Sequence, residues 1–306
     1  MGNYYVKRFL SMVVTLFLIV TITFFLMRAI PGGPFTREKP LPDEIVARLE
    51  AKYNLDAPLF EQYVDYMKGL VTFDLGPSYR ILGMSVNEMI SNGFPTSAKI
   101  GGIAAILIIV VGIPIGVVSA LKANSLTDYS VMFLATLGVT LPSFVIATGY
   151  IYIFAIKLDW VDATGLSSIG SYIGPVIALS GYSLSFVARL SRSSQLEVLQ
   201  QDYIRTARAN GISEFKVIMK HGLKNSLIPV VTYVGPMIAA ILTGSFVVET
   251  MFNLPGIGTY FVAAVQNRDY TVIIGMTVFY AAFYVVSVFL VDIAYSFIDP
   301  RIKLGN

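Results

Sequence analysis

Long stretches without a charged residue are the feature that most constrains this chain of 306 residues. Six occur, and each is close to or above the roughly 20 residues that a helix needs to cross about 30 Å of hydrocarbon. The runs are residues 9–27, 100–121, 129–156, 163–188, 225–248 and 270–291. We therefore expect an all-α polytopic membrane protein with six transmembrane helices.

The composition of the chain also indicates a membrane protein. Charged residues make up 13% of the chain and apolar residues 55%, whereas a soluble domain has roughly 25% charged residues. The chain has no cysteine, which excludes disulfides and thiolate metal sites. Its single histidine, His221, removes most zinc and Ser-His-Asp schemes.

Two of the runs need closer definition. The fourth opens with a Gly- and Ser-rich stretch, so we place its helix near residues 174–194 and its earlier part in an external loop. The first run is longer than the 7–15 apolar residues of a signal peptide and lacks a convincing cleavage site. It is interpreted as a retained anchor.

Basic residues in the short loops predict the orientation, because cytoplasmic loops are enriched in Lys and Arg. With the N-terminus inside, only Lys157 and Arg268 lie in the two short external loops. The cytoplasmic side then has twelve cations: Lys7, Arg8, Lys122, Arg189, Arg192, Arg205, Arg208, Lys216, Lys220, Lys224, Arg301 and Lys303. Both termini are therefore predicted to be cytoplasmic.

Two stretches outside the membrane are long enough to have structure. Residues 31–99 are external, and their apolar residues recur at helical spacing in EIVARLEAKYNL and again over 60–67, which predicts two short helices in a small subdomain. A helix pair that only covers loop backbone is the alternative. The predicted division is thus residues 1–30 (tail and first helix), 31–99 (external subdomain) and 100–306 (core with five helices).

The other stretch is the cytoplasmic loop 195–226, which has two helical patterns separated by Gly211. A glycine is typical just after a helix C-terminus, and Ser213 is placed to cap the second helix with its side-chain oxygen. A basic helical pair of this kind suits either a surface on anionic lipid or a docking surface for a cytoplasmic partner.

Few residues inside the spans are candidates for chemistry. Asp292 lies near the cytoplasmic end of the last span, where snorkelling or a hydrogen bond to a neighbouring helix is favoured over a proton relay. The spacing of Gly112 and Gly116 predicts helix packing. Possible pathway residues are Arg189, Arg192, Ser183 and Thr243, although snorkelling and packing explain them as well.

The loop around Gly211 resembles that of permease subunits of ABC importers. Gly211 and Ala207 fit the Glu-Ala-Ala-x-x-x-Gly pattern of that superfamily, whereas Arg205 and Thr206 replace its Glu and first Ala. DYIRTARANG followed by KHGLKNSLIPVV resembles the oligopeptide/dipeptide variant, as do GSFVVETMFNLPGIGTYF and VDIAYSFIDPRIK. The resemblance covers the whole chain. DLGPSYR and NGFPTSAK look most like the first of two oligopeptide permease subunits.

The resemblance implies the type I importer fold and a bacterial plasma membrane location. It also implies four partners for this chain: a homologous second permease, two cytoplasmic ATPase subunits that bind ATP and Mg²⁺, and an external peptide-binding protein. The chain itself would bind no cofactor. The residues implied to couple it to the ATPase are Tyr203, Arg205, Thr206, Ala207, Arg208, Ala209, Asn210, Gly211 and Glu214.

Other functions remain as alternatives. A dipeptide, nickel-chelate or sugar substrate is conceivable for family members that look alike. A self-standing carrier or channel is disfavoured because intramembrane charges are scarce. An enzyme is disfavoured because the chain has no H-E-x-x-H, G-x-S-x-G or P-loop motif.

Overall fold

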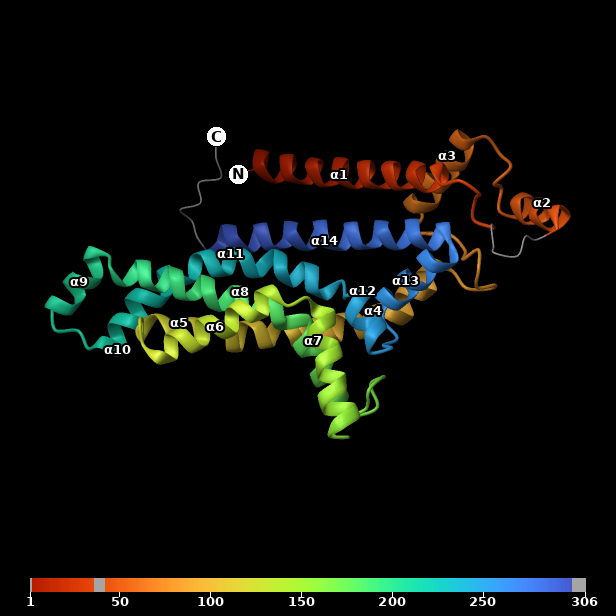
Figure 1. Cartoon of the computed structure of the whole chain (residues 1–306). Coiled ribbons are helices and arrows are strands. Elements are labelled where there is room, and N and C mark those ends of the chain that lie inside the picture. The colour runs from red at the N-terminus through yellow and green to blue at the C-terminus, as the bar shows by residue number, and fades with distance from the viewer. Residues whose placement is uncertain (1, 36–41, 299–306) are drawn as a thin grey trace. The chain divides into compact units, whose positions relative to one another are not determined.

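The computed structural model describes residues 2–35 and 42–298, and over these ranges the chain forms helices and no strand (Figure 1). The C-terminal cations Arg301 and Lys303 lie outside the described residues. Contacts divide the chain into two compact units, one of residues 1–95 with 255–306 and one of residues 96–254. The two units are defined by contacts within the chain, whereas the predicted domains were defined by their position relative to the membrane. The units therefore do not test the predicted domain bounds, which stay a prediction.

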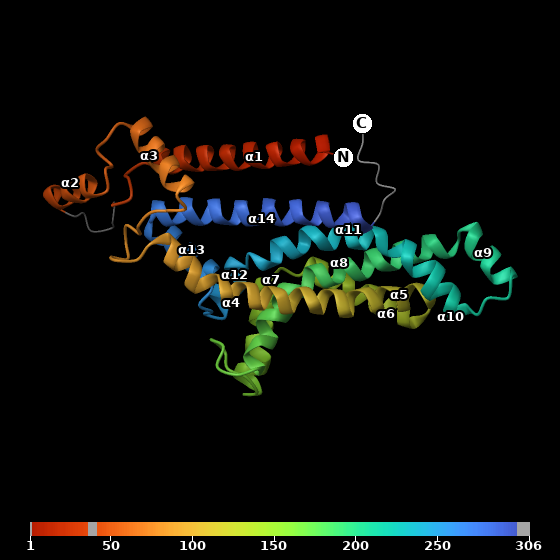
Figure 2. The same cartoon turned by 180° about the vertical axis from the view of Figure 1, so that it is seen from behind.

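The first unit contains the first and last long helices, α1 (Gly2–Ala29) and α14 (Tyr270–Ile298), which lie side by side (Figures 1 and 2). Phe24 of α1 and Ile274 of α14 are buried in one cluster. Tyr63 and Tyr66 of α3 (Leu59–Val71) pack on the same cluster, with their rings 5.4 and 5.9 Å from that of Phe24. Aromatic contacts thus fix α3 to the C-terminal part of α1.

Two short helices, α2 (Asp43–Lys52) and α3, confirm the helical patterns expected between the first two spans. The loop that follows α3 is tied to the junction of α13 (Ile257–Asn267) and α14. The buried Asp269 carboxylate accepts hydrogen bonds from the Ser78 hydroxyl and from the backbone N–H groups of Tyr79 and Arg80. This carboxylate orders a loop that has no regular structure of its own.

The second unit is organised around α8 (Ile173–Leu199), which contacts α5 (Ile113–Leu121), α6 (Leu126–Thr140) and α11 (Leu223–Leu242). Small residues allow the close approach. A Cβ at Gly116 would overlap the Ala188 carbonyl oxygen, and a Cβ at Gly112 would lie 3.1 Å from a Val187 methyl carbon. The predicted packing role of this glycine pair is confirmed.

Five helical segments are long and apolar enough to span a membrane among the described residues, and a bent pair provides a sixth. The five are Val6–Ala29, Val86–Leu121, Gly170–Leu199, Glu214–Met251 and Tyr270–Ile293. The second combines α4 (Val86–Leu107), the π-helical η1 (Ile108–Gly112) and α5. It therefore begins well before the predicted charge-free run.

The third predicted span, residues 129–156, is helical but sharply bent. The chain bends by 105° between α6 and α7 (Ser143–Tyr150), which continues into the π-helical η2 (Ile151–Lys157). Pro142 cannot donate a backbone hydrogen bond and disfavours the helical conformation of the residue before it. Leu141 accordingly adopts ψ 122°, which ends α6.

The fifth predicted span is also interrupted. The prediction covered residues 225–248, whereas the observed segment begins earlier, with α10 (Glu214–Lys216) and the π-helical η4 (Val217–Gly222). It continues as α11 and breaks before α12 (Phe246–Met251). Gly244 at the break has φ +85°, a conformation that favours glycine. The Ser245 side chain accepts from the Val248 N–H and so caps the short helix that follows.

Candidate functional site

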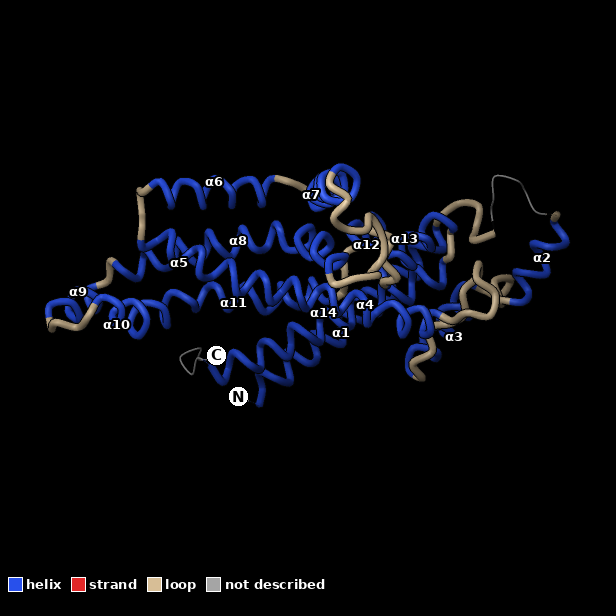
Figure 3. Tube along the Cα trace, turned by 90° about the horizontal axis from the view of Figure 1, so that it is seen from below, coloured by secondary structure: helices blue, strands red, loops and turns tan. Residues whose placement is uncertain are grey.

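The loop between α8 and α11 is the most structured polar region of the second unit. It comprises α9 (Asp202–Ala209), a turn at Gly211, α10 and η4. Figure 3 shows α9 and α10 beyond the ends of the long helices α8 and α11. The loop is thus presented as a knob at one end of this unit.

The loop has a small core of its own. Ile204 and Ala207 of α9 and Val217 of η4 are buried together, with Ile212 of the turn packed against them. Ile204 and Ala207 are three residues apart and so lie on one face of α9. The opposite face is left exposed, and the buried face holds the two halves of the loop together.

The turn at Gly211 is a Schellman motif. Gly211 has φ +74°, its N–H donates to the Arg208 carbonyl, and the Ile212 N–H donates to the Ala207 carbonyl. These bonds satisfy carbonyl groups left free at the end of a helix, and Gly is the residue that adopts this conformation most easily. The predicted helix end at Gly211 is confirmed.

An ion pair closes the turn from outside. The Arg208 guanidinium donates from Nε and Nη2 to the two Glu214 carboxylate oxygens at 3.0 and 2.7 Å. This two-point bond raises the pKa of Arg208 above its ordinary value, mainly through the hydrogen bonds. Because the pair is exposed, its contribution is to the geometry of the turn and only slightly to stability.

The cap predicted for Ser213 is wrong. Ser213 occupies the N-cap position of α10, but its side chain makes no capping hydrogen bond. Helix α10 is only one turn long before the chain adopts the wider π-helical spacing.

Two polar contacts lie where the loop meets the long helices α8 and α11. The buried Ser226 hydroxyl donates to the Gln195 side-chain oxygen at 2.5 Å, which joins α11 to α8. The Asn225 amide donates to the Tyr203 hydroxyl at 2.8 Å, which joins α11 to α9. Helix α9 is thus bonded to α11, and α11 is bonded to α8.

The residues proposed for coupling lie together on this loop, and all but one are exposed. The exposed ones are Tyr203, Arg205, Thr206, Arg208, Ala209, Asn210, Gly211 and Glu214. Ala207 is buried in the loop core, where it supports α9 and is not available to a partner. Arg205 also lies 3.7 Å from Asp202 of the same helix.

Sequence reasoning missed two exposed apolar side chains on this loop. Phe215 is 73% exposed and Met219 is 51% exposed. Their four-residue spacing places them on one face of the second helical segment, and large apolar side chains exposed beside charged ones are typical of interaction surfaces. The helical spacing of apolar residues in this part of the sequence is the same for an exposed face and for a buried face, so it did not identify Phe215 and Met219 as exposed.

The predicted pathway residues are not gathered into one site. The Arg192 guanidinium makes two hydrogen bonds of 2.6 Å to the buried Asp128 carboxylate, which also accepts from the Ser119 hydroxyl. Arg189, on the same helix, is exposed. The structure thus shows Arg192 joining α8 to α6, and a part in peptide exit stays a prediction.

Of the other two pathway residues, the buried Ser183 accepts a long hydrogen bond of 3.5 Å from the Tyr233 hydroxyl. The Thr243 hydroxyl donates to the Ala240 carbonyl at 2.6 Å. Neither observation identifies a substrate contact, so both stay predictions.

Asp292 contacts a neighbouring helix, which is one of the two explanations that the sequence left open. Its carboxylate lies 2.7 Å from the Arg8 guanidinium of α1, within the first unit. A contact between neighbouring helices therefore accounts for this acidic residue in the last span.

Comparisons with known proteins agree along the whole chain. A model of the family described as binding-protein-dependent transport system inner membrane component matches residues 112–304, and its N-terminal companion matches residues 1–100. The dipeptide transport system permease protein DppB of Bacillus subtilis is 47% identical over 99% of both chains. The oligopeptide transport system permease protein OppB of Escherichia coli is 43% identical over 99% of this chain and all of that one.

Among solved structures, a chain of the MetNI methionine ABC transporter in inward-facing conformations matches with a TM-score of 0.52. It covers 71% of this chain and 95% of its own length at 16% identity. That likeness shows the fold: the helices of this chain follow the arrangement of an ABC importer permease.

Proposed function

This chain belongs to the family of binding-protein-dependent transport system inner membrane components, and on that premise we propose that it forms half of the pathway of an ATP-driven oligopeptide importer. It is an inner-membrane permease subunit, related over nearly its full length to oligopeptide and dipeptide permeases. Both termini are assigned to the cytoplasm, as the basic residues of the short loops indicate.

One observation supports the coupling role above the others: the compact loop 195–226 with its own core. A movement of a bound partner reaches a membrane span only if the element between them is rigid. The buried contact of Ile204, Ala207 and Val217 supplies that rigidity, and the contacts at Gln195 and Tyr203 connect the loop to α11. Alternating access is largely rigid-body motion, for which such a knob is suited.

Four partners follow from this proposal. A homologous permease completes the pathway, two cytoplasmic ATPases dock on the coupling loops, and an external binding protein delivers the peptide. ATP and Mg²⁺ are assigned to the ATPases, and this chain is assigned no cofactor and no catalytic site. Closure of the ATPase pair on ATP then moves the permeases between inward-open and outward-open states.

Dipeptides are the second candidate substrate. The relative from Bacillus subtilis, 47% identical over 99% of this chain, bears the name of a dipeptide permease. Dipeptides and oligopeptides share a backbone and charged ends, so a permease for either needs few contacts with particular side chains.

Co-purification tests the proposal. The tagged chain is isolated from its own membranes in mild detergent, and the associated proteins are identified by mass spectrometry. A second six-span permease with one or two P-loop ATPases is the expected result. Recovery of the chain alone or as a homo-oligomer would overturn it and leave the loop around Gly211 as a membrane-surface element.

A further inference from the structure

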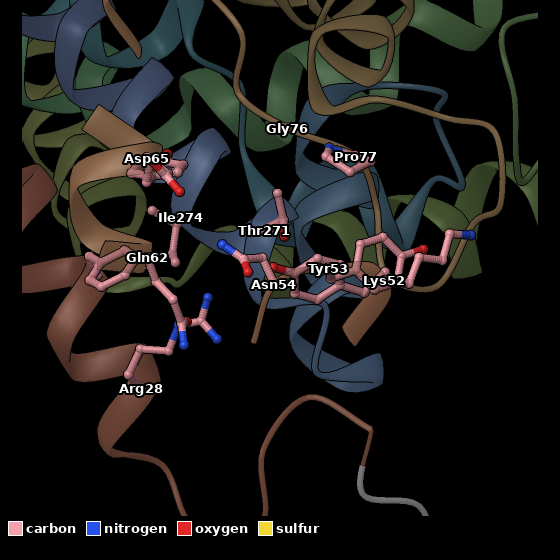
Figure 4. A pocket seen from close by; sticks show the side chains of 13 residues that line it. Arg28, Lys52, Tyr53, Asn54, Gln62, Asp65, Gly76, Pro77, Thr271 and Ile274 are labelled. Atoms are coloured by element: carbon pink, nitrogen blue, oxygen red, sulfur yellow. The ribbon is translucent and has the colours of Figure 1, made fainter. Parts of the chain in front are cut away.

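The first unit contains a cavity of about 330 Å³ that the proposed transport mechanism does not use (Figure 4). Its walls come from the C-terminal part of α1, the C-terminal end of α2 with the two residues after it, the middle of α3, the segment 76–79 and the first turns of α14. The volume is in the range of small-molecule pockets, and such pockets combine apolar walls with a few polar groups.

One cation in this wall has no acidic partner among the described residues. Arg28 ends α1, and its guanidinium carbon lies 5.4 Å from the centre of the Phe24 ring. Its Nε atom is buried and makes no hydrogen bond in the described part of the chain. Figure 4 shows the Arg28 guanidinium and the Asn54 amide reaching toward the same space from opposite sides. A half-buried guanidinium whose Nε is buried and unbonded is a binding group for a carboxylate.

Two further buried polar atoms lie in the wall without a hydrogen-bond partner in the described residues, the Gln62 side-chain oxygen and the Tyr66 hydroxyl. The Gln62 amide nitrogen donates to the Leu55 and Ala57 carbonyls at 3.0 and 2.8 Å, which fixes the amide and leaves its oxygen as an acceptor. Burial raises the pKa of Tyr66, so its hydroxyl stays neutral and able to donate.

The cavity also has a negative group. Asp65 lines it and bonds Lys68 at 2.9 Å, a cation that is not part of the wall. The rings of Tyr53 and Tyr79, 4.6 Å apart, form an aromatic side. The wall thus has two cations, Arg28 and Lys52, one anion, an acceptor and aromatic rings, and it offers groups for both charges of a ligand that has a carboxylate and an ammonium group.

We propose that this cavity binds a short peptide with two free ends, whose carboxylate pairs with Arg28 and whose ammonium group is held by Asp65 and the Gln62 oxygen. The choice of a peptide as the ligand rests on the proposed function. The cavity is a second peptide site, separate from the translocation pathway, and in the proposed topology it faces the outside.

The test measures binding of trialanine to the purified transporter complex by isothermal titration calorimetry, without binding protein and without ATP. C-terminally amidated trialanine, N-acetylated trialanine and inorganic phosphate serve as comparisons. The expected result is binding of trialanine at least tenfold tighter than each blocked peptide, and weaker binding of phosphate. No binding of trialanine, equal binding of a blocked peptide, or phosphate binding as tight as that of trialanine would each overturn the proposal.

Variants then locate the bound peptide. Tyr66→Phe removes a hydroxyl that has no hydrogen bond in the described structure, so folding and thermal stability should not fall while trialanine binding weakens several-fold. Arg28→Gln should weaken it at least tenfold. The matched control Arg48→Gln removes an exposed cation of α2 that is not in the wall, and its binding should be unchanged. Unchanged binding in both Tyr66→Phe and Arg28→Gln would place the peptide elsewhere and refute the site.

A parallel assay separates this inference from the function. ATP-driven peptide uptake by the same complex with its binding protein reports the function alone. Uptake without trialanine binding at the cavity would refute the second site and leave the importer intact. Binding at the cavity without uptake would support the site and count against the importer.

Discussion

At the scale of single residues, two features shape the second unit: the turn at Gly211 and the ion pair of Asp128 with Arg192. Gly211 stands where a helix must end, and the structure gives it the expected left-handed conformation. Asp128 marked only the start of a charge-free run, yet its carboxylate is bound by Arg192, 64 residues further along the chain. No periodicity or spacing encodes that contact, because it depends on how α6 and α8 pack.

Replacing Gly211 with Val tests the turn. A β-branched residue at φ +74° is strained by about 1–2 kcal/mol, and the space around its Cβ is open, so the effect is on the turn and not on packing. ATP hydrolysis by the complex should continue while peptide uptake per ATP falls several-fold. Gly211→Asn is the control, because Asn tolerates this conformation. Unchanged uptake in Gly211→Val would contradict the coupling role.

The Asp128–Arg192 pair predicts an asymmetric loss of stability. The Asp128 side chain is 1% exposed and that of Arg192 is 25% exposed. Arg192→Ala leaves a buried carboxylate without its cation and should cost about 3 kcal/mol of unfolding free energy. Asp128→Ala leaves an arginine that reaches solvent and should cost less.

The double variant completes a cycle that isolates the pair, measured by thermal unfolding in detergent. It should be more stable than the sum of the single losses predicts. Equal and additive losses would show that the two side chains do not act together.

At the scale of elements, hydropathy finds the helices but not their breaks. All six predicted runs contain helix, because a helix satisfies every backbone group within the membrane. The bend at Pro142 and the break at Gly244 interrupt two of them. Both residues are visible in the sequence, but the angle at each depends on packing against α8 and on the short helices that follow.

The exposed face of the coupling loop predicts a specific cross-link. The chain has no cysteine, so Phe215→Cys introduces a unique thiol at a position 73% exposed on this loop. With a short reagent that carries a maleimide and a photoactivated diazirine it should join this chain to an ATPase subunit, identified by its mass. Ile204→Cys, whose side chain is buried in the loop core, is the control and should give little product. A Phe215→Cys product with lipid only would indicate a membrane-surface loop.

At the scale of the whole molecule, the family and the number of spans were predictable from the sequence, whereas the compact units were not. The resemblance along residues 1–306 agrees with relatives that match 99% of the chain. The grouping of residues 1–95 with 255–306 depends on contacts such as those of Asp269 with Ser78, which are 191 residues apart. The cavity beside Arg28 arises from the same grouping and has no signature in the sequence.

The predicted topology is checked with two single cysteines. Glu44→Cys in α2 should react with a membrane-impermeant maleimide in intact cells or spheroplasts, because residues 31–99 are assigned to the outside. Asn210→Cys in the coupling loop should react only after the membrane is permeabilised. Both positions are exposed in the structure. The reverse labelling pattern would contradict the assignment that rests on the basic residues.

Transport of peptides by this chain as part of an ATP-driven complex can be measured directly. The measurement is uptake of a radiolabelled tripeptide into proteoliposomes that contain the purified complex. The binding protein is added on the side of the permease that faces out of the cell, and ATP is supplied on the side of the ATPase subunits. We expect peptide to accumulate only when both the binding protein and ATP are present, and accumulation to stop when ATP is replaced by a non-hydrolysable analogue. Uptake without ATP, or by this chain alone, would contradict it.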